Sequence, residues 1–259
     1  MFIIGLTGGI ACGKSTVAGI LKELGAVIID TDQVAREVVA PGRPAYREIV
    51  AAFGPLVLRP DGQLDRPALA RIIFNDPTAR ELLNAITHPR IRKRVEELLA
   101  EVRRNDPGAV VVIEAPLLFE ASMEKMMDAV WALTAPAPVR LKRLIARDNL
   151  SLLEAESRLK AQGEEGARLR RANRVIPTGG DLAATRAAVQ AAWQELQRRL
   201  GNNRIQGTVT GDAPGQQDHV YPDKNHTVGG VTGSATGLQA GKGHLDGSNQ
   251  VPGGVPWEK

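Results

Sequence analysis

Short apolar segments alternate with longer amphipathic segments along the first 200 residues. The apolar segments have the length of buried strands, and in the segments between them apolar residues recur every three or four positions, the period of a helix. Strands that alternate with helices are typical of an α/β fold with a parallel sheet. The predicted strands cover residues 3–6, 27–29, 110–113, 128–134 and 174–177.

Residues 41–106 lack a strand pattern and are interrupted repeatedly by proline. This is more helix than a crossover between two strands needs, so we expect a helical domain inserted between the second and third strands. We expect the insertion to bind the second substrate. The predicted helices cover residues 45–53, 67–74, 78–86 and 89–103.

The sequence HPRIR, residues 88–92, opens the last of these predicted helices. An anion at this point would meet a helix N-terminus together with arginine side chains, which makes His88 and Arg92 candidate substrate ligands. Alternatively, His88 is a helix-entry residue and the arginines face solvent.

The first predicted strand breaks into glycines and then into a helical pattern, in the stretch GLTGGIACGKST. The stretch matches G-x-x-x-x-G-K-[ST], the loop that binds the phosphates of ATP or GTP. Glycine lets backbone N–H groups turn toward a triphosphate, lysine supplies a charge for the β- and γ-phosphates, and serine suits Mg²⁺. A glycine-rich turn without a ligand is the alternative, but the flanking strand and helix patterns favour the nucleotide. The expected nucleotide-binding residues are Gly8, Gly9, Ala11, Cys12, Gly13, Lys14, Ser15 and Thr16.

Carboxylates follow two of the predicted strands, at the edge where open parallel sheets bind ligands. Asp32 follows the second strand and is a candidate general base or metal-shell ligand, whereas Asp30 or Thr31 is a candidate helix cap. Glu114 ends the third strand in a Walker B arrangement, so with Ser15 it is a candidate Mg²⁺ ligand, directly or through water. The alternative for Glu114 is a buried ion pair with an arginine.

Arginines are concentrated after the fourth predicted strand. Arg140, Arg143 and Arg147 are three and four residues apart, so they share one helix face, and a capping box, SLLE, opens a second helix. We expect both helices, within residues 139–165, to form a lid over the transferred phosphoryl group, in which the arginines of the lid neutralise its charge while the lid excludes water. A solvated basic helical hairpin is the alternative.

The amino-acid composition limits which partners and which cellular location we expect for the protein. The net charge of +4 suits anionic ligands, but only 3% of residues are aromatic and no basic run is interleaved with them, so we expect no nucleic-acid partner. No apolar run is long enough to cross a membrane, and the single cysteine, Cys12, cannot form an internal disulfide, so we expect a cytoplasmic protein without a membrane partner.

Cys12 is also expected to react readily, because Lys14 and a helix N-terminus lie close to it. No apolar helix face is clearly left over, so we expect a monomer.

At Gly201 the composition changes. Residues 201–259 hold 13 of the 27 glycines and show neither helical nor strand periodicity. A chain of this kind buries too little apolar surface to offset the entropy lost on ordering. We therefore expect one folded domain over residues 1–200 and a disordered, glycine-rich tail over residues 201–259.

Together the motifs of residues 1–200 resemble those of the dephospho-CoA kinase family. The matching segments are GLTGGIACGKST, IDTDQVAREVV, HPRIR, EAPLLFE and RLIARDNLSLLEAESRL with AQ following. The resemblance implies a three-layer P-loop kinase core with a parallel sheet, a helical CoA-binding domain and a helical lid. It further implies transfer of the γ-phosphoryl group of ATP to the ribose 3′-hydroxyl of dephospho-CoA, with Mg²⁺. By position, Asp32 is the implied general base, His88 and Arg92 fall in the CoA-binding region, and Arg143 and Arg147 fall in the lid.

Three features depart from the family pattern. Ala11 and Cys12 stand where a Gly-Ser pair is common, and Glu114 stands where many members have aspartate. The segment RVIPTGG lacks the asparagine often found before its glycine, which affects the contacts expected with adenine.

Two other functions use parts of the same pattern. One is another small-molecule kinase, acting on a nucleoside monophosphate or a sugar acid, and the other is a nucleotide-dependent switch protein. The N-K-x-D motif with which a GTPase reads guanine is absent from the sequence. The predicted lid, the insertion and Asp32 favour a phosphoryl acceptor over water or a protein partner.

Overall fold

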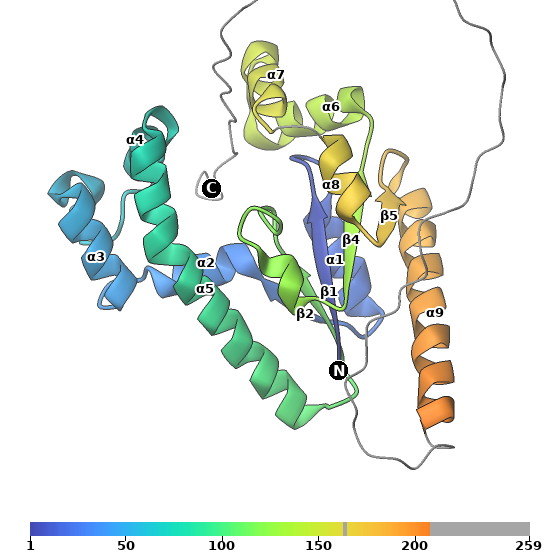
Figure 1. Ribbon diagram of the computed structural model, residues 1–259. Coiled ribbons are helices and arrows are strands. Elements are labelled where there is room, and N and C mark those ends of the chain that lie inside the picture. The colour runs from blue at the N-terminus through green and yellow to red at the C-terminus, as the bar shows by residue number, and fades with distance from the viewer. Residues whose placement is uncertain (163–164, 208–259) are drawn as a thin grey trace, which may run out of the picture. The chain divides into compact units, whose positions relative to one another are not determined.

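Five parallel strands form the central sheet of the computed structural model, which describes residues 1–162 and 165–207 (Figure 1). The strand order is β2-β3-β1-β4-β5. This order places β1, whose carboxyl end carries the glycine-rich loop, in the middle of the sheet. The expected α/β fold with a parallel sheet is confirmed. The strands are β1 (Phe2–Gly8), β2 (Val27–Asp30), β3 (Val110–Glu114), β4 (Ala129–Thr134) and β5 (Arg174–Pro177).

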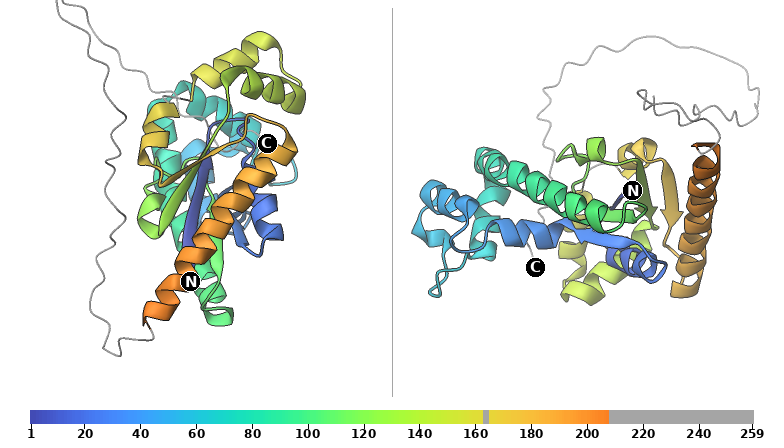
Figure 2. Two further views of the ribbon diagram at one scale, coloured as in Figure 1. Left: turned by 90° about the vertical axis from the view of Figure 1, so that its right-hand side faces the viewer. Right: turned by 90° about the horizontal axis from the view of Figure 1, so that it is seen from below.

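Helices cover both faces of the sheet (Figure 2). One face carries Ile3, Val111 and Ile113, which join an apolar cluster with the helices between β2 and β3. On the other face, α1 (Lys14–Glu23) packs against β1 and β3. Burial on both faces explains why these strands are continuous apolar runs.

The segment between β2 and β3 is helical, as expected for the insertion. The long α5 packs against α2, α3 and α4. The elements are α2 (Thr31–Val38), α3 (Pro44–Phe53), the 3₁₀ helix η1 (Pro55–Val57), α4 (Arg66–Asn75) and α5 (Pro77–Asn105).

The prediction of two helices over residues 78–103 is wrong, because α5 is continuous and contains Pro89. A proline inside a helix removes one backbone hydrogen bond and costs about 3 kcal/mol. Packing of Leu83, Ile91 and Val95, all nearly inaccessible to solvent, offsets this cost. His88 and Arg92 therefore lie in the middle of a helix, so the expected anion site at a helix N-terminus does not exist at this point.

Three helices rather than two lie between β4 and β5: α6 (Ala137–Asp148), α7 (Leu152–Lys160) and α8 (Glu165–Arg171). The capping box at the start of α7 is confirmed, because Ser151 Oγ accepts from Glu154 N–H and the Glu154 carboxylate accepts from Ser151 N–H. The sequence pattern did not predict α8, which packs against β4.

The last helix, α9 (Leu182–Gly207), is capped by Asp181 and continues past Leu200. The tail predicted over residues 201–259 thus begins with helix, and its residues from 208 onward lie outside the described part of the chain. Within the described residues, none of the helices combines the length and the hydropathy needed to cross a membrane. A further 3₁₀ helix, η2 (Met123–Met126), precedes β4.

Candidate active site

The glycine-rich loop connects β1 to α1 in a conformation that exposes backbone N–H groups. Gly13, the residue before α1, has a φ of 79°, and Ala11 has a φ of 60°. Left-handed values of this kind cost a residue with a Cβ about 1–2 kcal/mol, which explains the glycine at position 13 and the common glycine at position 11 in the family pattern. Among the described residues no side chain caps α1, so its first N–H groups are available to an anion.

Lys14 lies at the start of α1 and turns back over the loop. Its Nζ donates to the carbonyl oxygen of Gly8 at 3.0 Å. Burial lowers the pKa of Lys14, while the negative charges of Glu114 and Asp32 act in the opposite direction. The lysine is therefore held at the loop among carboxylates, where a bound phosphate would add the negative charge that favours its protonated form.

Glu114 ends β3 beside the first turn of α1. Ser15 Oγ donates to Glu114 Oε1 at 3.2 Å, and Asp30 is the partner of Glu114 in the β2–β3 register. Burial raises the pKa of Glu114, and the charge of Asp30 raises it further. A hydroxyl and a carboxylate are oxygen donors that suit Mg²⁺, which takes one or two protein carboxylates and otherwise water and phosphate. The residues fit the ion, and no arginine of the described residues forms the alternative ion pair with Glu114.

Asp32 lies in the first turn of α2. The preceding Asp30 caps this helix by accepting from the N–H groups of Asp32 and Gln33, as the sequence predicted. The half-buried Asp32 is close enough to Lys14 and Glu114 for its charge to affect both groups. The structure thus brings together the phosphate loop and both of the predicted catalytic acids.

A pocket lined by Asp32 offers about 550 Å³ of empty space, part of which is open to solvent. The long helix α5 lines it with Asn84, His88 and Arg92, which are one turn apart, and the segment after β3 supplies Leu117 and Met123. Burial lowers the pKa of His88, and so does the charge of Arg92. Asp32, His88 and Arg92, chosen from two separate motifs, therefore line one cavity.

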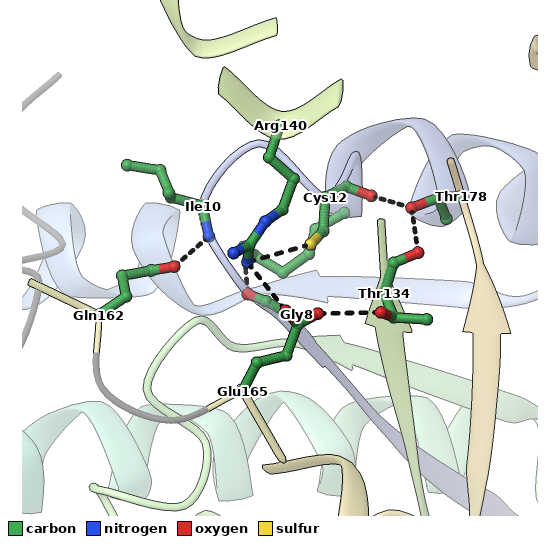
Figure 3. Close-up of polar contacts among 9 residues, drawn as sticks. Gly8, Ile10, Cys12, Thr134, Arg140, Gln162, Glu165 and Thr178 are labelled. Carbon is green, nitrogen blue, oxygen red and sulfur yellow. Dashed lines mark hydrogen bonds and ion pairs between the residues drawn. The ribbon is translucent and has the colours of Figure 1, made fainter. Parts of the chain in front are cut away.

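Among the three arginines of α6, Arg140 is the one that reaches the phosphate loop (Figure 3). The sequence analysis did not distinguish it from Arg143 and Arg147. The guanidinium of Arg140 lies 4.0 Å from Cys12 Sγ and 3.5 Å from Glu165 Oε2. It is 9% exposed, and its Nε has no hydrogen-bond partner among the described residues. Its position four residues before the wholly buried Leu144 does not distinguish it, because Arg147 lies three residues after Leu144 and would share the same helix face.

Gln162 is a second residue that the sequence analysis left without a role. Its side-chain oxygen accepts a hydrogen bond from the backbone N–H of Ile10, in the glycine-rich loop (Figure 3). The end of α7 is thereby tied to the phosphate site. No periodic pattern marks such a contact, because it joins a side chain to a backbone group far away in the sequence.

The two lid arginines chosen from the sequence have other partners in the structure. Arg143 Nη2 donates to the carbonyl oxygens of Thr178 and Gly180, between β5 and α9, at 2.7 and 3.3 Å. Arg147 forms two hydrogen bonds with the adjacent Asp148. The structure therefore does not bring either of them to the phosphate loop.

The β5–α9 connection also supports the phosphate loop. Thr178, in the segment that departs from the family pattern, donates from Oγ1 to the carbonyl oxygen of Cys12 at 2.8 Å. Cys12 is itself wholly buried, which argues against the ready reaction expected from its sequence position. The Cys12 side chain packs into the core of the protein, below the backbone of the loop.

Comparisons with known proteins agree with this geometry. The model of the family described as dephospho-CoA kinase matches residues 2–184. A dephospho-CoA kinase from Moorella thermoacetica is 83% identical over 203 residues, which are 78% of this chain and 96% of that protein. One from Geobacter metallireducens is 49% identical, with 75% of this chain and 96% of that protein covered. Among solved structures, dephospho-CoA kinase from Campylobacter jejuni is 30% identical with a TM-score of 0.59, covering 77% of this chain and 98% of its own. Protein TT1252 from Thermus thermophilus is 35% identical with a TM-score of 0.65, covering 75% and 97%.

Proposed function

The chain belongs to the dephospho-CoA kinase family and uses ATP to phosphorylate dephospho-CoA to coenzyme A, and on this premise we propose which residues carry out the transfer. The observation that supports the proposal most strongly is the position of Asp32. Asp32 lines the pocket of α5, and its charge acts on Lys14 of the phosphate loop, which supports a role for this one acid toward both substrates.

We propose that the pocket holds the adenosine end of dephospho-CoA with the ribose 3′-hydroxyl against Asp32. The carboxylate orients the hydroxyl and accepts its proton as the oxygen attacks the γ-phosphorus of ATP, while the bond between that phosphorus and the β–γ bridging oxygen breaks and ADP leaves. The side chains of α5 bind the rest of this end of the acceptor. Arg92 supplies a charge for its diphosphate, and His88 in its neutral form supplies a hydrogen bond.

The loop and the lid hold the nucleotide. Backbone N–H groups from Ala11 to Thr16 bind the phosphates, and Lys14 contacts the β- and γ-phosphates. Arg140, rather than Arg143 and Arg147, neutralises charge on the transferred group, because it is the arginine held over the loop.

Ser15 and Glu114 would hold Mg²⁺. When bound, the ion offsets negative charge on the β- and γ-phosphates. The fold holds these two oxygen donors in position, because Glu114 ends β3 and Ser15 lies in the first turn of α1.

The test compares acceptors and an isosteric variant. Mass spectrometry after incubation with Mg·ATP should find coenzyme A from dephospho-CoA, and no comparable product from AMP, shikimate or gluconate. Asp32→Asn should lower kcat by about a hundredfold or more, while binding of an ATP analogue stays within about twofold. Preference for another acceptor, or full turnover by Asp32→Asn, would contradict the corresponding assignment. The monomeric state, the cytoplasmic location and the lack of a nucleic-acid partner stay predictions.

A further inference from the structure

The short helix α8, absent from the sequence predictions, is anchored at the phosphate site by Glu165. Thr134 Oγ1, at the end of β4, donates to Glu165 Oε1 at 2.9 Å, and Arg140 Nη1 lies 3.5 Å from Glu165 Oε2 (Figure 3). One face of α8 is thereby turned toward the loop that holds the nucleotide. Arg168 follows Glu165 by three residues and so lies on the same helix face.

Arg168 differs from the other cations of this region in its partners. Lys14 has the carboxylate of Glu114 near it, and Arg140 has that of Glu165. Arg171, on the same helix, is paired with Glu124 at 2.7 Å and lies over the ring of Phe119. Arg168 is half-buried, and residues 1–162 and 165–207 offer it neither a hydrogen bond nor an ion pair.

Arg168 lies near the nucleotide site. Burial is the main cause that lowers the pKa of Lys14, and the positive charge of Arg168 adds to this effect, so the two cations are close enough to repel each other. Two positive charges held together without carboxylates for both are costly unless an anion joins them. The anion expected beside Lys14 is the terminal phosphate of ATP.

We propose that Arg168 is a further catalytic residue of this enzyme, whose guanidinium contacts the γ-phosphate of ATP beside Lys14. The proposal rests on the function proposed above for the loop. Arg140 shares its charge with Glu165, whereas Arg168 is paired with none of the described residues. The helices α6 to α8 then act as one lid, in which Glu165 joins α8 to Arg140 of α6.

The experiment compares Arg168→Ala and Arg168→Lys with Arg170→Ala as the matched control. Arg170 is exposed and lies two residues further along α8, which turns it away from the face of Glu165 and Arg168. Binding of ADP and of a non-hydrolysable ATP analogue is measured without acceptor, and kcat and KM are measured with dephospho-CoA.

Arg168→Ala should weaken binding of the ATP analogue about tenfold and that of ADP by less than about twofold, because a single charge-assisted contact to the γ-phosphate is lost. It should also lower kcat by about tenfold or more, with partial recovery in Arg168→Lys and no change in Arg170→Ala. Equal losses for ADP and the ATP analogue, no loss at all, or a rise confined to KM for dephospho-CoA would overturn the proposal. Because nucleotide binding is measured without the acceptor, a wild-type protein that binds ATP but does not phosphorylate dephospho-CoA would contradict the proposed function alone.

Discussion

Arg140 of the lid lies directly against Gly9 of the phosphate loop, so closely that a Cβ atom at Gly9 would overlap with Nη1 of the arginine. The next nearest atom to such a Cβ would be Gln162 Oε1, at 3.1 Å. Both neighbours are the ends of flexible side chains from the lid. Gly9 is therefore the position at which the loop leaves room for the lid.

This relationship predicts the effect of Gly9→Ala. The added methyl group should displace Arg140 without unfolding the core, since Gly9 does not need a left-handed backbone. We expect kcat to fall about tenfold or more, and Gly9→Ala combined with Arg140→Ala to be no worse than Arg140→Ala alone, because both changes remove the same contact. Steady-state kinetics on the double-mutant cycle checks this. Additive losses would show that Gly9 acts independently of Arg140.

Gly19→Ala is a matched control in the same helix–loop unit. Gly19 lies inside α1, and a Cβ there would have no neighbour within 4 Å. Alanine in a helix interior is favoured over glycine by about 0.5–1 kcal/mol, so the free energy of unfolding should rise by about that amount. Urea denaturation measures the gain, and kcat should not change.

Replacement of each of the three arginines of α6 should have a different effect on kcat and on stability. Arg140→Ala should lower kcat about a hundredfold, because a buried cation at the phosphate loop is removed. Arg147→Ala should change kcat by less than about twofold, since it pairs with the neighbouring Asp148 at the surface. Arg143→Ala should act mainly through stability, by releasing the carbonyl groups between β5 and α9. Measuring kcat and the melting temperature for all three separates these outcomes, and a dominant kinetic loss in Arg147→Ala would contradict the assignment.

The sequence predicted well those parts of the site that depend on local backbone geometry. The phosphate loop, the cap at Asp30 and the carboxylate at the end of β3 each follow from a strand end and its next few residues. In a parallel sheet all strand ends meet at one edge, so these groups had to lie close together. The same reasoning placed Asp32 beside the nucleotide.

The lid and the insertion were predicted less well, because their details depend on tertiary packing. A charged stripe shows that Arg140, Arg143 and Arg147 share a face, but which of them is buried depends on what α6 packs against. The short α8 has too few apolar residues to show a period. Pro89 is normally a sign of a helix end, and only the packing of α5 against its neighbours shows that the helix continues.

Glu114→Gln tests the proposed metal ligands. The amide keeps the shape of the side chain but loses its charge, so the Mg²⁺ concentration required for half-maximal nucleotide binding should rise about tenfold. Titration of a fluorescent ATP analogue with Mg²⁺ reports this without relying on turnover. Glu120→Gln, an exposed position six residues further on, serves as the control and should not shift the titration. An unchanged titration for Glu114→Gln would remove Glu114 from the metal site.

The half-buried histidine of the pocket, His88, predicts how stability depends on pH. Burial and the charge of Arg92 lower the pKa of His88 from its ordinary value of 6.5, so the unfolded chain takes up this proton at a higher pH than the folded chain does. The stability contributed by neutral His88 is therefore complete above about pH 6.5 and is lost as the pH falls toward the lower pKa of the folded state. His88→Gln cannot bind this proton, so its melting temperature should fall less than that of the wild type between about pH 7.5 and about pH 5. Both proteins keep the histidines beyond residue 207, so any contribution of these histidines to the pH dependence of stability cancels in the comparison. An identical pH dependence in the two proteins would show that the native state already accommodates a protonated His88.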